Sequence, residues 1–235
     1  SSVTLATVIP RLSYVRDNAE WEFLHPVNGW RTSISASMSP LLSEGGISFQ
    51  TLSLDVRRYF RLFGGTSGAI RVSGGASFGR DAQSYLVGGL PWLFSSEDGR
   101  YSDENQLPIF EGNGPNLDGL KTIYFSQYLT PLRGTQLMEL VGNQAMLLNL
   151  EYRFPFLIYY FPALRMLGQL GGVLFVDTGI VWNDLTGTRT QRITYGWGPR
   201  FLLFGLPFQL DFAWPYNPPD GDRSRNWYLT VGTDF

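Results

Sequence analysis

The chain has 235 residues, of which 43% are hydrophobic, 15% aromatic and only 16% charged, with 27 glycines and no cysteine. A formal net charge of -2 with scattered basic residues excludes the basic surface that nucleic-acid binding needs, so no nucleic-acid partner is expected. The lack of cysteine excludes a disulfide framework and a thiolate metal site. Low charge with many aromatic residues and glycines favours a membrane or secreted β-protein, and the length suits one all-β domain.

Helices that could span a membrane are not expected. No stretch approaches the roughly 18 uninterrupted apolar residues that such a helix needs. The most apolar stretch, 154–164, is interrupted by Pro155 and Pro162. The chain opens at Ser1 without a methionine or the features of a secretory signal, so we expect a processed chain or a fragment. If the chain crosses a membrane, we expect it to do so with strands.

In chain order, segments of about ten residues repeat one pattern, apolar on one parity and polar on the other. The first clear example lies at 30–40, where Trp30, Ile34 and Met38 alternate with serine and arginine residues. The alternation recurs at 51–60, 70–78, 148–154, 193–203, 208–214 and 226–235. With an opening strand near 3–16 and another at 167–182, the period-two pattern predicts about nine strands and almost no helix.

The polar parity carries Arg, Asp and Glu residues. A small soluble barrel buries such charges only at a high free-energy cost, whereas a hydrated lumen tolerates them. The sequence therefore predicts an all-β fold, a transmembrane antiparallel up-and-down β-barrel with an apolar face toward lipid and a polar face toward an aqueous interior.

The connections between these strands differ in length. The turns at 63–67 and 204–207 are tight, whereas 183–191 and 216–225 are longer and polar, as expected for short periplasmic turns and long external loops. The longest connection, at about 81–142, carries several acidic residues between 97 and 118. We expect a single barrel domain over 1–235, with this connection as an external or lumenal loop, because a stretch so long is usually functional.

Five motifs follow one another along the chain. In order, they are Asp17, Asn18, Pro26, Asn28, Gly29 and Trp30; Gly88 and Gly89 with Leu132, Arg133 and Gly134; Asn149, Glu151, Arg153 and Pro155; Phe175, Asp177 and Gly179; and Gly232 with Phe235. Their order resembles the bacterial surface antigen barrel of the BamA and TamA superfamily, which also includes two-partner secretion transporters. The resemblance covers essentially the whole chain.

The resemblance implies that the second motif is the tip of the sixth external loop, which folds back into the lumen. Glu151 and Asp177 lie on the polar parity of neighbouring strands, and a planar guanidinium can hold carboxylates through paired hydrogen bonds. We therefore expect a loop-lumen lock formed by Arg133, Gly134, Glu151, Asp177 and Gly179. The alternative is that these charges are ordinary solvated residues of the lumen.

The chain departs from the family pattern in several places. The family barrel has sixteen strands, usually preceded by periplasmic POTRA domains, so we expect this chain to be the C-terminal portion of a larger barrel. An insertion at 94–130 separates the two halves of the loop motif, and Thr135 stands where the family has an aromatic residue. The resemblance also implies an assembly signal at the C-terminus, formed by Trp227, Leu229, Gly232 and Phe235.

The resemblance implies a non-enzymatic function in the bacterial outer membrane: assembly or insertion of outer-membrane proteins, or translocation of polypeptides. The expected partners are outer-membrane lipid, client outer-membrane or secreted polypeptides, and periplasmic domains or other chains that complete the barrel. The last strand would offer an edge to an incoming strand. No cofactor, metal or catalytic residue is expected. The alternative function is a passive pore or a membrane anchor for a periplasmic domain.

Two enzymatic readings are disfavoured. Residues 176–179 match the aspartic-protease tetrapeptide, but that chemistry needs two carboxylates that share a proton, and the tetrapeptide occurs once. The single histidine, His25, falls in a predicted turn without a second histidine or a cysteine, which disfavours a metal site or a histidine-based triad.

Overall fold

The structure is a computed structural model that describes residues 8–22, 25–40, 47–90, 94–95, 126–156, 170–183, 189–218, 221 and 225–232. All regular structure within these ranges is β-strand, and they contain no helix long and apolar enough to cross a membrane. The acidic residues between 97 and 118, and the terminal Phe235, lie outside the described residues.

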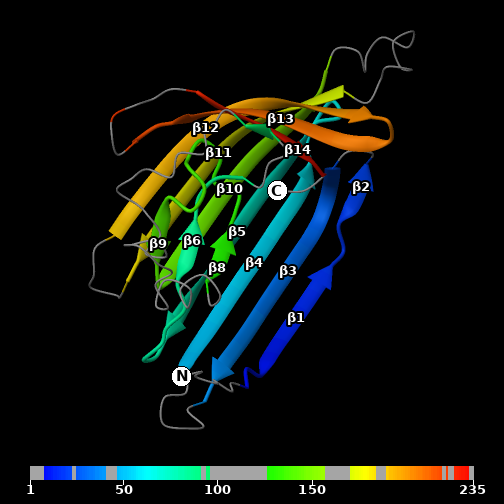
Figure 1. The fold of residues 1–235 in the computed structure, drawn as a ribbon. Coiled ribbons are helices and arrows are strands. Elements are labelled where there is room, and N and C mark those ends of the chain that lie inside the picture. Colours follow the sequence, from blue (N-terminus) through cyan, green and yellow to red (C-terminus); the bar gives the residue numbers. More distant parts are fainter. Residues whose placement is uncertain are drawn as a thin grey trace.

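Eleven of the described strands form one curved antiparallel sheet, and we call nine of them the wall (Figure 1). In spatial order they are β1 (Arg11–Asp17), β3 (His25–Ser39), β4 (Phe49–Arg61), β5 (Ser67–Phe78), β10 (Gln144–Pro155), β11 (Leu170–Trp182), β12 (Arg189–Leu203), β13 (Leu206–Pro215) and β14 (Asn226–Val231). Each wall strand pairs antiparallel with the next one along the chain, and between β5 and β10 the chain makes its longest excursion. The all-β, antiparallel, up-and-down prediction is confirmed.

The start of the chain differs in detail from the prediction. Within the described residues the first strand runs from Arg11 to Asp17, and β2 (Glu20–Glu22) continues along the same neighbour, β3. The motif at 17–30 therefore lies mostly within strands. Asn18 makes this possible because its backbone amide donates to the Trp30 carbonyl at 3.0 Å while its side chain accepts from the Trp30 amide at 2.8 Å.

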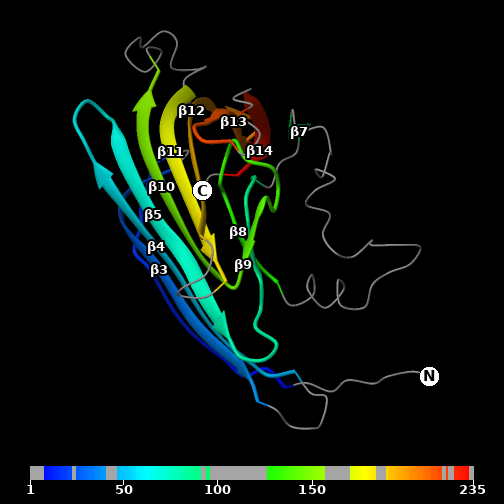
Figure 2. The same cartoon turned by 90° about the vertical axis from the view of Figure 1, so that its left-hand side faces the viewer.

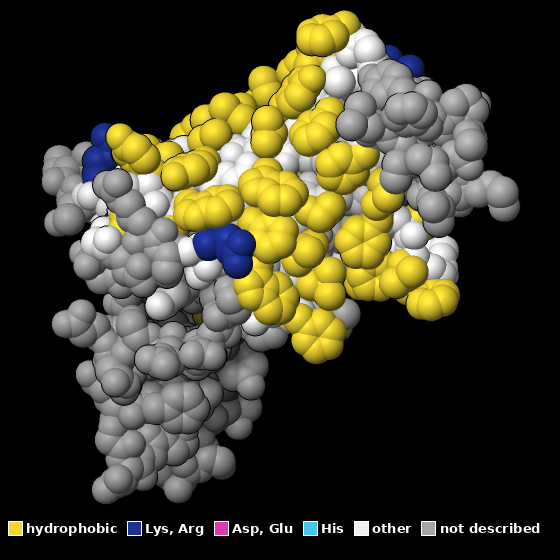
Figure 3. Space-filling model, turned by 90° about the horizontal axis from the view of Figure 1, so that it is seen from above, with side chains coloured by type: hydrophobic (Ala, Val, Ile, Leu, Met, Phe, Trp, Pro, Cys, Tyr) yellow, Lys and Arg dark blue, Asp and Glu magenta, His cyan; other side chains and the backbone are white. Residues whose placement is uncertain are grey.

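The two faces of the wall differ in chemistry, as the alternation predicted. The convex face is apolar, and Figure 3 shows hydrophobic side chains gathered across it. Its exposed members include Trp30, Ile34, Met38, Leu52, Leu54, Ile70, Met146, Leu150, Leu174, Val176, Tyr195 and Trp197. The concave face carries buried polar side chains, including Ser35, Thr51, Arg71, Asn149, Glu151, Arg153, Asp177, Thr194 and Asp211. This distribution is the reverse of a soluble protein, which buries its apolar face.

A second, smaller sheet lies on the concave side of the wall (Figure 2). It consists of β8 (Gln127–Leu129), β6 (Tyr85–Val87) and β9 (Leu140–Gly142), all from the excursion between β5 and β10. A small apolar core joins it to the wall. The core comprises Tyr85, Val87, Leu132, Leu140, Ala145, Leu147 and Val181. The concave face is therefore not polar along its whole length, because β10 and β11 turn apolar where the small sheet covers them.

The last wall strand is only partly paired on its outer edge. On one side β14 pairs with β13 over six residues, from Asn226 to Val231. On the other side its one partner among the described strands is β7 (Phe94–Ser95), at Tyr228 and Leu229. Within the described residues β1 and β14 do not pair with each other, so the sheet is open, as expected for part of a barrel.

Candidate functional site

The site is built on the chain segment that contains Arg133, on the concave side of the wall. The two halves of the loop motif, far apart in sequence, meet there through a β-bridge between Gly89 and Leu132, with the Leu132 amide donating to the Gly89 carbonyl at 2.8 Å. Thr135 stabilises this junction because its hydroxyl accepts from the Gly89 amide at 3.0 Å and donates to the Leu132 carbonyl at 2.7 Å. A small hydroxyl residue therefore has a structural role at a position where an aromatic residue was expected.

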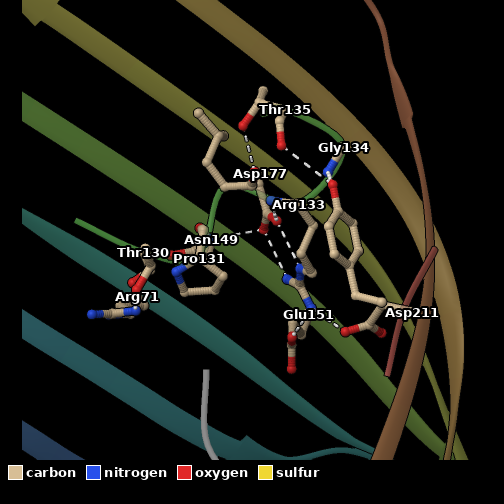
Figure 4. A network of polar contacts seen from close by, with 12 residues as sticks. Arg71, Thr130, Pro131, Arg133, Gly134, Thr135, Asn149, Glu151, Asp177 and Asp211 are labelled. Carbon is tan, nitrogen blue, oxygen red and sulfur yellow. Dashed lines mark hydrogen bonds and ion pairs between the residues drawn. The ribbon is translucent and has the colours of Figure 1, made fainter. Parts of the chain in front are cut away.

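Arg133 reaches carboxylates on two neighbouring strands of the wall (Figure 4). Its Nε and Nη2 donate to the two oxygens of Asp177 at 2.7 and 2.8 Å, and its backbone amide donates to Asp177 Oδ2 at 3.2 Å. Its Nη1 donates to Glu151 Oε1 at 2.7 Å. The guanidinium thus makes the paired contact that a flexible ammonium cannot reproduce.

This cluster is removed from solvent. The side chains of Arg133, Glu151 and Asp177 are at most 3% exposed. Burial alone would lower the pKa of the Arg133 guanidinium, but the negative charges of Asp177 and Glu151 outweigh that effect and raise its pKa above the ordinary value. Arg133 therefore stays charged, and its positive charge balances the negative charge of its carboxylate partners.

Further charges complete the cluster on both sides. Asp211 of β13 lies 3.8 Å from Arg133 Nη1 and 2.7 Å from Arg200 Nη1 of β12. Arg153 of β10 donates to Glu151 Oε2 at 2.8 Å. Three arginines thus face three carboxylates, and buried charges are tolerated only when they are paired in this way.

Shape as well as charge positions the tip, which we define as Leu132–Gly134. The Arg133 guanidinium carbon lies 3.6 Å from the centroid of the Phe175 ring, a cation–π contact. A Cβ at Gly179 would lie 2.7 Å from Leu132 Cδ2, so glycine there leaves room for the tip. Gly134 has a φ of +84°, which favours glycine, and a Cβ there would lie 3.1 Å from Ala213 Cβ.

The structure therefore brings all five predicted lock residues together, and it adds two that were not predicted to contact the loop, although Asn149 belongs to the third motif. Asn149 donates to both Asp177 Oδ1 and the Pro131 carbonyl at 2.8 Å. Arg71 of β5 donates to the Thr130 carbonyl at 2.6 Å. Asn149 and Arg71 stood on the polar parity of their strands, but nothing in the spacing showed that they contact the loop.

The residues of the expected assembly signal occupy the end of the wall. Trp227 and Leu229 lie in β14, and Gly232 follows directly, with its amide donating to the Pro207 carbonyl at 3.0 Å. Gln209 Nε2 of the neighbouring strand donates to the Gly232 carbonyl at 2.7 Å. The residues of the predicted signal thus lie on or next to β14, the last strand of the wall, except for Phe235, which lies outside the described residues.

The aspartic-protease interpretation does not fit this geometry. Both oxygens of Asp177 accept hydrogen bonds from Arg133, whereas an aspartic dyad needs a second carboxylate that shares a proton with the first. His25, expected in a turn, is the first residue of β3. Among the described residues no group of three potential metal ligands is found.

An antiparallel wall with an apolar convex face, a charged concave face and an inserted loop defines part of a transmembrane β-barrel. The model of the Omp85 superfamily domain matches residues 6–235, and the chain belongs to this superfamily. Its fold is similar to the crystal structure of BamA from Haemophilus ducreyi lacking POTRA domains 1-3, with a TM-score of 0.58 and 15% sequence identity. The match covers 95% of this chain and 42% of that one. No curated protein sequence matches the chain.

Proposed function

We propose that this chain is the part of an outer-membrane barrel that assembles or inserts outer-membrane proteins, or translocates polypeptides, in the bacterial outer membrane. The observation that carries the proposal is the buried contact of Arg133 with Glu151 and Asp177, which fixes an inserted loop against the inner wall. A simple pore has no need of a loop tip held by charges that are costly to bury. A loop held in one defined position suits a machine that changes state during a cycle.

The edge of β14 supplies the second element of the proposal. A strand with unpaired backbone groups is a template for another strand, and client barrels are built from such strands. In the part of the chain that the structure describes, β14 pairs with β13 over its whole length, and on the other side with β7 at Tyr228 and Leu229. An incoming client strand would therefore take the place of β7, whose described contact with β14 is two residues long.

Assisted folding of a client tests this proposal. The full-length protein, in lipid vesicles, is mixed with an unfolded outer-membrane β-barrel client, and folding is followed by the change in gel mobility. We expect faster client folding than in empty vesicles, slower folding with Arg133→Ala, and a disulfide between the client's terminal strand and a cysteine introduced at Leu229. The matched control carries a cysteine at Leu150 on the lipid-facing side of β10, which should not crosslink.

The alternative is a passive pore or a membrane anchor. A steady, large conductance in a planar bilayer, together with client folding no faster than in empty vesicles, would favour that alternative and refute the proposal.

A further inference from the structure

The loop tip also contacts the last strand of the wall. Tyr228 of β14 is fully buried, and its hydroxyl accepts a hydrogen bond from the Gly134 amide at 3.0 Å. The same hydroxyl donates to the Thr135 carbonyl at 3.3 Å. One side chain of the end strand thus satisfies two backbone groups of the loop, using both the donor and the acceptor capacity of a tyrosine hydroxyl.

These contacts extend the reach of the tip across the wall. Arg133 is bound to β10 and β11, and two strands, β12 and β13, separate β11 from β14. The gap is filled by a small apolar cluster in which the Tyr228 ring packs with Val173, Phe175 and Ala213. Phe175 is also the ring beneath the Arg133 guanidinium. The arginine and the tyrosine therefore share packing partners as well as neighbouring residues of the loop.

We infer that Tyr228 is a positioning residue that couples the seating of the loop tip to the closure of the C-terminal strand. Among the described residues, β7 pairs with β14 at two positions only, so the two hydrogen bonds from Tyr228 to the loop add to what holds the outer side of this strand. Release of the tip would break both of these hydrogen bonds to the buried Tyr228 hydroxyl, which is unfavourable. Release of β14 would in turn leave the Gly134 amide without its partner, so each event promotes the other. The coupling between the loop tip and β14 does not depend on the proposed function. Only the use of this coupling in client assembly rests on that function.

Hydrogen exchange of the full-length protein in lipid nanodiscs tests the coupling at peptides covering 130–135 and 226–231. Tyr228→Phe removes both hydrogen bonds of the hydroxyl and keeps the ring, so we expect exchange to accelerate in both peptides by at least about fivefold, the factor for the loss of one hydrogen bond of about 1 kcal/mol. Tyr195→Phe is the control, because Tyr195 lies exposed on the convex face. Acceleration in 226–231 alone, or in neither peptide, would overturn the inference.

A reciprocal variant separates coupling from a local packing effect. Arg133→Lys weakens the tip without touching β14, and we expect it to accelerate exchange in 226–231 in the wild-type background but to add little once Tyr228→Phe is present. Acceleration confined to 130–135 would refute the coupling. Coupled exchange in variants that leave client folding unchanged would support the coupling while refuting the proposed function, so the two failures are distinguishable.

Discussion

The contact of Arg133 with Asp177 and Glu151 can be tested by Arg133→Ala. The substitution removes three charge-assisted side-chain hydrogen bonds of 2.7 to 2.8 Å and leaves carboxylates that are at most 3% exposed. Breaking one side of a buried ion pair costs about 3 to 5 kcal/mol, and even about 3 kcal/mol raises the population of the undocked loop by roughly 150-fold. Arg133→Lys keeps the charge but loses the paired geometry, so its effect should be intermediate, about 1.5 to 3 kcal/mol.

The measurement is cleavage of the loop by a non-specific protease in the full-length protein, under conditions where cleavage follows the population of the open state. We expect a cleavage rate about 100-fold above wild type for Arg133→Ala, in line with the lower end of that range. Arg80→Ala is the control, because Arg80 forms an exposed ion pair with Asp81, and exposed pairs contribute little. Cleavage of Arg133→Ala within threefold of wild type would show that these residues are ordinary lumen charges and would refute the lock.

Three further predictions concern the wall and its contact with the loop. Arg71→Met removes the donor to the Thr130 carbonyl and should raise hydrogen exchange at 127–131 by about fivefold, a smaller effect than that of Arg133→Ala; unchanged exchange would contradict it. Ile34→Arg, on the convex face at mid-strand, should lower the free energy of unfolding of the barrel in vesicles by about 2 to 4 kcal/mol, measured by urea titration. The adjacent Ser33→Arg, which faces Asp55 across the sheet, should lower it by less than about 1 kcal/mol. Equal losses of stability would refute the assignment of the two faces. Brominated lipid should quench the fluorescence of Trp30, so the quenched part of the tryptophan fluorescence should be smaller in Trp30→Phe than in wild type. Equal quenching in the two proteins would place Trp30 away from lipid.

Much of the wall was predictable because a strand places alternate side chains on opposite faces, and this period is visible in the sequence. Ile34 beside Ser33, and Leu150 beside Glu151, are enough to assign each strand its two faces without any knowledge of its neighbours. The number of wall strands follows from the same local pattern, and the tight turn predicted at 204–207 is found at 204–205; neither depends on long-range contacts. The resemblance in motif order then pointed to Arg133, Glu151 and Asp177.

The interior depended on tertiary structure. The small sheet of β6, β8 and β9 combines short segments on both sides of an insertion, and strands of three residues leave too little periodicity to detect. For the same reason the apolar side chains of Ala145 and Leu147 on the concave face became understandable only once the small sheet was seen to cover them.

The local sequence thus determined which side of each strand meets lipid, because that information is carried by neighbouring residues. Only the tertiary structure decided that Tyr228 contacts Gly134 across 94 positions of sequence, and that Asp211 and Arg200 join the charge cluster. Contacts of this kind depend on the curvature and register of the whole wall, which bring distant strands to one loop tip, and no short segment of sequence contains that geometry.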